Sequence, residues 1–307
     1  MIRYLKHIEI DKSRWDNAIA LSSNGVIYAY SWYLDLVSPG WDALVENDYE
    51  TVMPLPRKSK YGFDYLFPPF FVQQLGVYSR SDDITGKKVT AFLNAIPASF
   101  RFIEMNLNTG NPLDDGTDFK LTENLTHHLL IDGSHDDLLN NYSENVLRNI
   151  RKAEKHNLNI SNSRDYKPLI ELFRKNRGKS IDTLQRENYE VFESLCKTVS
   201  NRKQMDMLSV FTGNELCAGM IVFRSNNFLI MIFSAISEAG KKCGAMHFAI
   251  DHFLKLAVDK YQGYTFDFEG SNQPALARFY KSFGSHEKIY LQVKRNKLPQ
   301  PLKWIKR

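Results

Sequence analysis

The stretch from Phe266 to Gly284, FDFEGSNQPALARFYKSFG, limits the possible folds of this chain more than any other segment. Apolar and acidic residues alternate from Phe266 to Glu269, which is typical of a strand. A Gly-Ser break follows, and Asn272 is expected to open a helix that ends at Gly284 in the left-handed conformation. The apolar face of that helix is expected to consist of Ala275, Phe279 and Phe283. The segment therefore predicts a strand, a turn and a helix in that order.

The length and composition indicate a folded chain of two domains. The 307 residues correspond to about two domains of ~150 residues each. Apolar runs such as 228–233 are far shorter than the roughly 20 residues of a membrane helix. The N-terminus shows no uninterrupted apolar stretch of a secretory signal. We therefore expect a cytoplasmic protein without a transmembrane segment.

Cysteine and histidine give no metal signature. Cys196, Cys217 and Cys243 are widely spaced and odd in number, which favours free thiols in a reducing compartment. The neighbouring His127 and His128 lie on a predicted strand, where their side chains face opposite ways. No His, Cys and Asp set has metal spacing, so no metal site is expected.

Positive charge is concentrated in two places. The last fourteen residues, 294–307, carry six basic and no acidic groups, while the whole chain has a net charge of +5. A second cluster lies on a predicted helix and consists of Arg148, Arg151, Lys152 and Lys155. Such patches attract the phosphates of nucleic acid, of a nucleotide cofactor or of anionic lipid. The alternative is a solvated helix face and a frayed end.

Both halves of the chain predict a similar order of elements. In the second half we expect strands at 158–161, 207–212, 216–223, 228–236, 264–268 and 289–293, with helices at 166–176, 186–199 and 244–260 beside the one after Asn272. In the first half we expect strands at 6–10, 43–46, 49–55, 61–67, 100–107 and 126–132, with helices at 11–21 and 84–96 and a short one that Ser31 caps. Each half thus pairs a meander with one crossover.

The strand–turn–helix segment with FYKSFG resembles the corresponding part of GNAT-type acyltransferases, and more closely that of the FemABX-like peptidyltransferases. Three further stretches carry the resemblance: WDNAIALSSNGVIYAYSWYL, PPFFVQQLG and NVLRNIRKAEKHN. The resemblance extends to about residue 293. It implies an α/β (α+β) fold of two tandem GNAT-like domains, with mixed, mostly antiparallel sheets flanked by helices. The expected boundaries are 1–133 for a degenerate N-terminal domain, 134–157 for a helical connection and 158–307 for the C-terminal domain with its basic tail.

The same resemblance implies transfer of an acyl or aminoacyl group to an amine. Tyr280 would protonate the departing group, and Lys281 would lie near the acyl carbonyl or the tRNA end. The residues themselves favour Asp267 and Glu269 as bases for the amine, because alternation on a strand places both on one side. The alternatives are a core aromatic for Tyr280, solvent-facing or capping acids, and a lysine that favours the helix dipole.

The donor loop matches the GNAT pattern only in part. The residues expected at the donor or cofactor are Lys241, Gly244, Ala245, Asn272 and Arg278. Met246 stands where the pattern has a second small residue, so its side chain would crowd a pyrophosphate and acetyl-CoA should bind weakly. The co-substrate is expected to be acyl-CoA or aminoacyl-tRNA, with no covalently bound cofactor.

The acceptor is expected to be a small molecule or a cell-wall (peptidoglycan) precursor. The residues expected to bind it are Trp32, Pro69, Phe70, Gln74, Arg148 and Arg151; for Trp32 the alternative is a place in the core. An acyl-CoA-dependent N-acetyltransferase is the second enzyme hypothesis. A non-catalytic relative that binds RNA or another polyanion, with peripheral membrane contact through the basic tail, is the alternative from another class.

Overall fold

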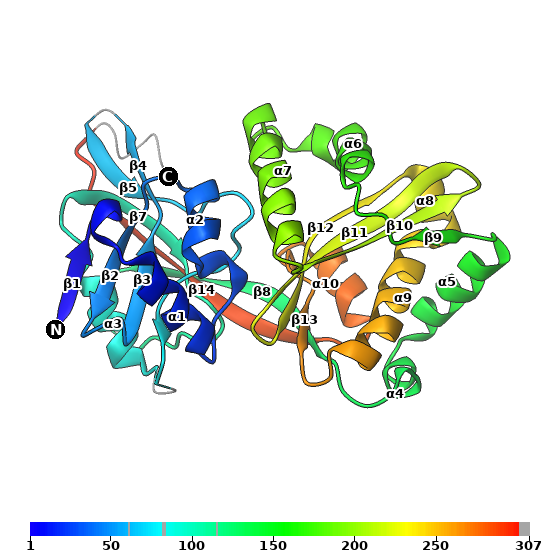
Figure 1. The fold of residues 1–307 in the computed structure, drawn as a ribbon, viewed down its shortest axis with the longest axis horizontal. Helices are drawn as coiled ribbons and strands as arrows, with labels where there is room; N and C mark the ends of the chain where they lie inside the picture. Colours follow the sequence, from blue (N-terminus) through cyan, green and yellow to red (C-terminus); the bar gives the residue numbers. More distant parts are fainter. Residues whose placement is uncertain (61, 82–83, 115, 301–307) are drawn as a thin grey trace. The chain divides into compact units, whose positions relative to one another are not determined.

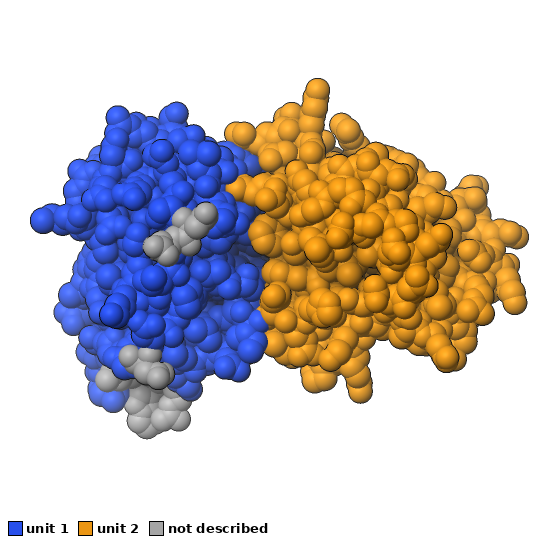
Figure 2. Space-filling view, turned by 90° about the horizontal axis from the view of Figure 1, so that it is seen from below, with its two compact units in different colours: residues 1–124, 289–307 blue, residues 125–288 orange. Residues whose placement is uncertain are grey.

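The computed structural model describes residues 1–60, 62–81, 84–114 and 116–300. The chain forms two compact units, Met1–Asn124 with Ile289–Arg307 and Leu125–Lys288 (Figure 2). The boundary between them falls inside two long strands, β8 (Lys120–Leu130) and β14 (His286–Asn296). The boundaries of these units differ from those of the expected domains, 1–133 and 158–307. The expected domain boundaries stay a prediction.

The first unit is a mixed α/β body. One sheet has the order β1-β2-β3-β6, and a second set of strands runs β4-β5-β7-β14. The strands are β1 Ile2–Leu5, β2 Asp42–Glu46, β3 Thr51–Leu55, β4 Arg57–Lys60, β5 Phe63–Leu66, β6 Tyr78–Ser79 and β7 Phe100–Asn106. The helices are α1 Lys12–Leu21, α2 Ser31–Val37 and α3 Gly86–Asn94.

Two local predictions in this unit are wrong. The strand expected at 6–10 is a 3-10 turn, His7–Glu9, because side-chain carboxylates bind its backbone: the Lys6 amide donates to Glu9 and the His7 amide to Asp42. Ser31 does not cap α2 but lies inside it, where Asp16 binds both its amide and its hydroxyl.

The loop that carries PPFFVQQLG is held at its end by an asparagine clamp. Asn111 accepts from the Val77 amide and donates to the Val77 carbonyl. Gly76 has a φ of +111°, and a Cβ there would lie 2.1 Å from Asn111 Oδ1. Only glycine fits this position, so the motif glycine is explained by backbone geometry.

The second unit is a sheet with helices on both faces. The strand order is β8-β13-β12-β11-β10-β9, antiparallel except for the β12–β13 pair. The remaining strands are β9 Asn159–Ser161, β10 Met205–Thr212, β11 Glu215–Ser225, β12 Phe228–Ile236 and β13 Thr265–Asp267. Helices α6 Lys167–Lys175 and α7 Arg186–Asn201 cover one face, and α5 Glu144–Lys155 and α9 Ala245–Lys260 the other (Figure 1). The order of elements expected for this half is found along the chain, with a short α8 (Glu238–Cys243) added and α4 (His135–Asn140) in the expected helical connection. The strand expected at 289–293 is part of β14 and belongs to the first unit.

The core of this unit joins α9, the sheet and α10 (Pro274–Lys281). Phe266 packs on Phe253 of α9 with ring centroids 5.3 Å apart, and Phe268 packs on Tyr280 of α10 at 4.9 Å. Burial of each such ring contributes about 2–3 kcal/mol. The two phenylalanines therefore fix α9 and α10 on the same side of β13.

The signature segment folds as predicted in outline, with shifted boundaries. Gly284 is left-handed, with a φ of +80°. Asn272 does not open α10; the helix begins at Pro274, and Asn272 Oδ1 instead accepts the Leu125 amide at 2.8 Å. Ala275 is exposed rather than part of the apolar face, and Leu276 and Phe279 of α10 pack against the core.

Candidate active site

A cavity of about 300 Å³ opens in the second unit between β12, the α8–α9 junction and α10. Its walls are mostly apolar. The lining residues are Met231, Ser234, Ile236, Lys241, Gly244, Met246, His247, Leu276, Phe279 and Tyr280. The cavity thus brings together Tyr280 and the predicted donor residues Lys241 and Gly244, which lie far apart in the sequence.

The sheet is split beside this cavity. β13 pairs in parallel with β12 only at Phe228, Leu229 and Ile230, whereas β12 continues to Ile236. In the described chain no strand pairs with this side of β12 beyond Ile230. The edge of residues 231–236 therefore offers backbone groups to an extended ligand chain in the cavity.

The N-terminus of α9 forms one end of the cavity. Gly244 has a φ of +77°, and a Cβ there would lie 2.6 Å from the backbone oxygen of Asn149 on α5. No side chain caps α9, so the amides of its first turn are available to a ligand. The helix dipole favours an anion at this point. Lys241, in an exposed ion pair with Glu238 at 2.5 Å, adds positive charge.

Met246 forms part of the cavity wall. It is 8% exposed and packs into the core of the second unit. Its side chain thereby narrows the cavity beside the first turn of α9. The expectation that Met246 weakens acetyl-CoA binding stays a prediction.

Glu269 adopts an unusual backbone conformation directly after β13. Its φ is +54°, in the left-handed region that non-glycine residues rarely adopt. Asp267 Oδ1 accepts its amide at 2.8 Å and Ser271 Oγ donates to its carbonyl at 2.7 Å. Burial raises the pKa of Glu269 from its ordinary value of 4.5 to about 8. A carboxyl group with such a pKa can act as a general base near neutral pH.

Asp267 supports the turn that follows β13. It is buried, and its carboxylate accepts from Thr126 Oγ1 at 2.5 Å and lies 3.4 Å from His128 Nε2. The expectation that Asp267 and Glu269 alternate on one strand face is wrong, because β13 ends at Asp267 and the turn re-aims the chain. Asp267 holds the turn that presents Glu269.

Tyr280 stands between the cavity and the core. It is 6% exposed and lines the cavity. Burial raises the pKa of Tyr280, and the negative charges of Glu269 and Asp267 raise it further. The phenol therefore keeps its proton at neutral pH, which is the form that a general acid needs to protonate a leaving group.

Six of the residues predicted for catalysis or donor binding lie outside the cavity lining, and Asp267 and Glu269 are two of them. Lys281 is exposed and pairs with Glu287 at 3.4 Å. Arg278 is exposed, and Ala245 is fully buried at the start of α9. Asn272 is used by the Leu125 amide. The structure thus joins Tyr280, Lys241 and Gly244 at the cavity, but not these six.

The predicted acceptor residues of the first unit differ in their surroundings. Trp32 packs between Tyr30 and Tyr33, with ring centroids 6.0 and 5.7 Å away. Pro69 is buried and Phe70 is 38% exposed. Phe70 thus presents an apolar ring at the surface.

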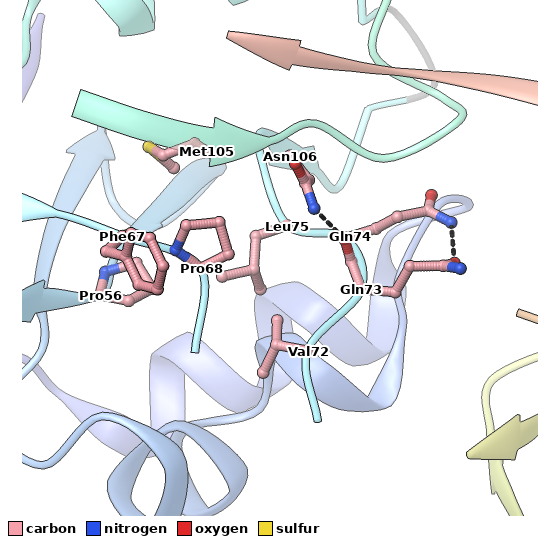
Figure 3. A pocket seen from close by; sticks show the side chains of 9 residues that line it. All are labelled: Pro56, Phe67, Pro68, Val72, Gln73, Gln74, Leu75, Met105 and Asn106. Carbon is pink, nitrogen blue, oxygen red and sulfur yellow. Dashed lines mark hydrogen bonds between the residues drawn. The ribbon is translucent and has the colours of Figure 1, made fainter. Parts of the chain in front are cut away.

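Gln74 is engaged within its own loop. It donates to Gln73 Oε1 at 2.7 Å (Figure 3). It also accepts the Thr109 amide at 3.0 Å. The pocket drawn there has a volume of about 10 Å³, which suffices for one water molecule. The described contacts of Gln74 therefore support the loop.

The two basic regions differ in their contacts. Arg148 and Arg151 are exposed on α5, beside the Asn149 that Gly244 touches. The expectation of a frayed, solvated chain end is wrong for Lys294, Arg295 and Lys297. They pair with Glu104 and Asp118, because β14 continues to Asn296 beside β7. The remaining basic residues of this end, at 303–307, lie outside the described residues.

Two histidines at the site did not follow from the sequence. His247 lines the cavity at 4.9 Å from the Phe279 ring, and burial lowers its pKa to about 4. His127 is fully buried with its ring 6.3 Å from that of Tyr280. Strand alternation separated His127 from His128 correctly, but no sequence signal shows which helix a strand residue meets.

Neither a metal site nor a membrane span is found in the described parts of the chain. No three His, Cys, Asp or Glu side chains gather there as a metal site. No described helix is long and apolar enough to cross a membrane.

Comparison with known proteins agrees with this architecture. Residues 140–282 match the family described as acetyltransferase (GNAT) domain. The structure is similar to that of FemX, at 12% identity and a TM-score of 0.67 over 99% of both chains. No curated protein matches the sequence.

Two further solved structures share the fold. A tandem GNAT protein from the clavulanic acid biosynthesis pathway matches at 10% identity and a TM-score of 0.54, over 98% of this chain and 100% of that one. The C-terminal domain of a putative lysylphosphatidylglycerol synthetase from Agrobacterium fabrum matches at 8% identity and a TM-score of 0.52, over 96% and 94%. These likenesses show that the chain has the tandem GNAT fold, and its residues 140–282 match the GNAT acetyltransferase domain family.

Glu269→Gln should change the pH dependence of stability. The unfolded chain loses this proton near pH 4.5 and the folded chain near pH 8, so between these values the folded state binds more protons and stability falls as pH rises. The amide of the variant does not ionise, so the variant does not lose this stability as pH rises. Urea unfolding should show the variant more stable above pH 8 by up to about 5 kcal/mol, since the pKa rises by about 3.5 units and each unit corresponds to about 1.4 kcal/mol. Near pH 4 the two proteins should be equal, and an equal difference at both pH values would contradict the raised pKa of Glu269. The exposed Glu215→Gln is the control.

Proposed function

We propose that the protein is an N-acyltransferase whose donor occupies the cavity between β12, α9 and α10. The donor is an activated acyl group on a nucleotide carrier, either a CoA thioester or an aminoacyl-tRNA. The observation that carries the proposal is the joint position of Tyr280, the uncapped start of α9 and the free edge of β12 around one cavity. Phosphates suit the helix start, and an extended arm suits the strand edge.

Each side chain then has a role. Glu269, with its pKa raised to about 8, takes a proton from the attacking amine. The amine nitrogen attacks the acyl carbon and the bond to the leaving group breaks. Tyr280 gives its proton to that leaving group. Asp267 holds the turn that aims Glu269, and the exposed Arg148 and Arg151 on α5 attract the carrier's phosphates.

The proposed acceptor is an amine, and its proposed class is a cell-wall precursor. This class rests on the FemABX resemblance of the PPFFVQQLG loop, with Trp32 and Phe70 as the aromatic surface beside it. The proposed location is the cytoplasm. The proposed acceptor class is independent of the proposed donor site, because the donor cavity lies in the second unit and the PPFFVQQLG loop lies in the first.

The test is an acyl-transfer assay with two donor arms. A panel of CoA thioesters is followed by thiol release, and radiolabelled aminoacyl-tRNA by transfer of label, each with a panel of amines. Turnover in either arm that disappears in Tyr280→Phe supports the proposal and identifies the carrier. No turnover in both arms, together with tight RNA binding through α5, would instead support the non-catalytic polyanion-binding protein.

Met246→Ala should tighten the binding of acetyl-CoA. The shorter side chain widens the cavity beside the first turn of α9, where the pyrophosphate is expected. Calorimetry should show weak binding to the wild type and about 10-fold tighter binding to the variant, a gain of roughly 1.4 kcal/mol. Met207→Ala, a buried methionine outside this cavity, is the matched control. Micromolar affinity in the wild type would contradict the crowding by Met246.

A further inference from the structure

We propose that the donor cavity selects an uncharged, apolar acyl group larger than acetyl and rejects an aminoacyl group, whose α-amino group is a cation. The inference rests on the proposed function, in which the activated acyl group lies in this cavity beside Tyr280. It deepens that function, because it names the class of group that is transferred. The carrier that suits this class is a CoA thioester.

The wall of the cavity around Tyr280 is apolar. The leaving group must reach the Tyr280 hydroxyl, so the acyl carbon has to lie close to this ring. The ring of Phe279, which also lines the cavity, is 5.6 Å from that of Tyr280. Met231 and Leu276 add further apolar side chains to the lining. An acyl chain bound here exchanges water for apolar contacts, whereas a charged group loses its hydration.

No negative charge in the lining is available to an ammonium group. Among the described residues that line the cavity, none carries a carboxylate, and Lys241 is a cation. Glu238 lies outside the lining and is already paired with Lys241 at 2.5 Å. Binding an unpaired ammonium ion in such a site costs far more than binding a methyl group of the same size. Charge therefore separates an aminoacyl group from an alkanoyl group of equal shape.

His247 shows how strongly this wall disfavours a positive charge. Its side chain lines the cavity, with its ring 4.9 Å from that of Phe279 and 5.9 Å from that of Phe283. Burial lowers the pKa of His247 from 6.5 to about 4, which corresponds to a roughly 300-fold penalty on the charged form. An ammonium group in the same surroundings would meet a penalty of the same origin.

The two carboxyl groups of the turn after β13 have other tasks. Glu269 lies outside the lining and, in the proposed function, takes the proton of the acceptor amine. An ammonium group of the donor that paired with Glu269 would remove this base from the reaction. Asp267 is buried, accepts from Thr126 Oγ1 at 2.5 Å and binds the Glu269 amide at 2.8 Å. Neither carboxyl group can therefore serve an aminoacyl donor and keep its proposed role.

The size of the cavity favours an acyl group larger than acetyl. The cavity has a volume of about 300 Å³, and most of its side chains are those of methionine, isoleucine, leucine and aromatic residues. Each methylene group that leaves water for such a wall tightens binding about 4-fold. A longer acyl chain thus gains affinity that offsets the expected crowding of the pyrophosphate by Met246.

The experiment compares donors of equal shape on the same carrier. Isobutyryl-CoA and alanyl-CoA differ only by a methyl group in place of the ammonium group, and propionyl-CoA and glycyl-CoA form a second such pair. At about pH 6.5, kcat/KM of the wild type should be about 30–300-fold higher for the uncharged member of each pair. From acetyl-CoA to butyryl-CoA, kcat/KM should rise about 3–4-fold with each methylene group.

The pH dependence of the preference tests whether charge is its cause. The α-amino group has a pKa of about 8, so alanyl-CoA becomes neutral above this pH. The ratio of kcat/KM for isobutyryl-CoA to that for alanyl-CoA should therefore fall at least about 5-fold between about pH 6.5 and about pH 9.5. Both donors use the same base, so the titration of Glu269 cancels in this ratio. A ratio that is independent of pH would overturn the inference.

A carboxylate introduced into the wall provides the second arm. Ser234 is half-buried on β12 and lines the cavity. Ser234→Asp should shift the ratio at least about 10-fold toward alanyl-CoA, because the new carboxylate pairs with the ammonium group. Ser194→Asp, at an exposed position of α7 outside the cavity, is the matched control and should keep the wild-type ratio within about 2-fold. An unchanged ratio in a Ser234→Asp variant whose melting curve shows a folded protein would overturn the inference.

Failure of the inference and failure of the proposed function are separate results. Turnover of alanyl-CoA, glycyl-CoA or aminoacyl-tRNA that equals or exceeds turnover of the alkanoyl-CoA donors would overturn the inference and leave the proposed acyl transfer in place. No turnover with any acyl donor would overturn both.

Discussion

Glu269→Gln should lower kcat/KM for acyl transfer about 10²–10⁴-fold, the usual effect of removing a general base. The wild-type value should rise with pH and level off above about pH 8, because only the deprotonated Glu269 can accept the amine proton. The residual activity of the variant should lack that rise. Initial rates of transfer from pH 6 to pH 9.5 provide the measurement.

The matched control for this prediction is Glu287→Gln. Glu287 is an exposed glutamate that pairs with Lys281 at the end of α10. It should leave the first turnover and the pH midpoint unchanged. If Glu269→Gln kept both the wild-type rate and the wild-type pH profile, Glu269 would be a strained turn residue without a part in proton transfer.

Tyr280→Phe should lower kcat about 100-fold or more, because the leaving group then departs without a proton. The ring remains, so its packing at 4.9 Å on Phe268 is retained and the free energy of unfolding should change by less than about 1 kcal/mol. The defect should shrink with an aryl thioester donor, whose more acidic thiol departs easily as an anion. Steady-state rates with alkyl and aryl thioesters measure this.

Tyr142→Phe is the control for the hydroxyl. Tyr142 is also buried, with its ring 5.3 Å from that of Phe283, but it does not line the cavity. Loss of the Tyr142 hydroxyl should leave kcat within about 2-fold of the wild-type value. An equal fall in both variants, or a Tyr280→Phe defect that is the same for alkyl and aryl donors, would rule out leaving-group protonation by Tyr280.

Local patterns predicted those features that depend on short stretches of chain. Helical period and glycine placement predicted α10 and the left-handed Gly284, and the strands expected at 207–212 and 216–223 form the hairpin of β10 and β11. Asp11 caps α1 by accepting the amides of Ser13 and Arg14, at the start of the helix expected at 11–21. These interactions join residues within a few positions of each other, so sequence spacing suffices.

Features that depend on partners far away in the sequence could not be predicted from local patterns. The turn at Glu269 leaves the strand pattern because Asp267 binds its amide, and Asp267 is itself held by Thr126. The sequence shows no partner for Arg295, whereas in the structure Arg295 pairs with Asp118, a residue distant in the chain. The place of His127 next to Tyr280 requires the pairing of β8 with β13, which no local pattern shows.

Hydrogen–deuterium exchange tests the donor site most directly. The protein is measured alone and with two probes, a thioether analogue of acetyl-CoA and an amide-linked analogue of the aminoacyl-tRNA end. At saturation by one of them, amides of 231–236 on β12 and 244–248 at the start of α9 should exchange at least about 10-fold more slowly. Unchanged exchange in both segments, with either probe shown to be bound, would contradict the placement of the acyl donor in this cavity.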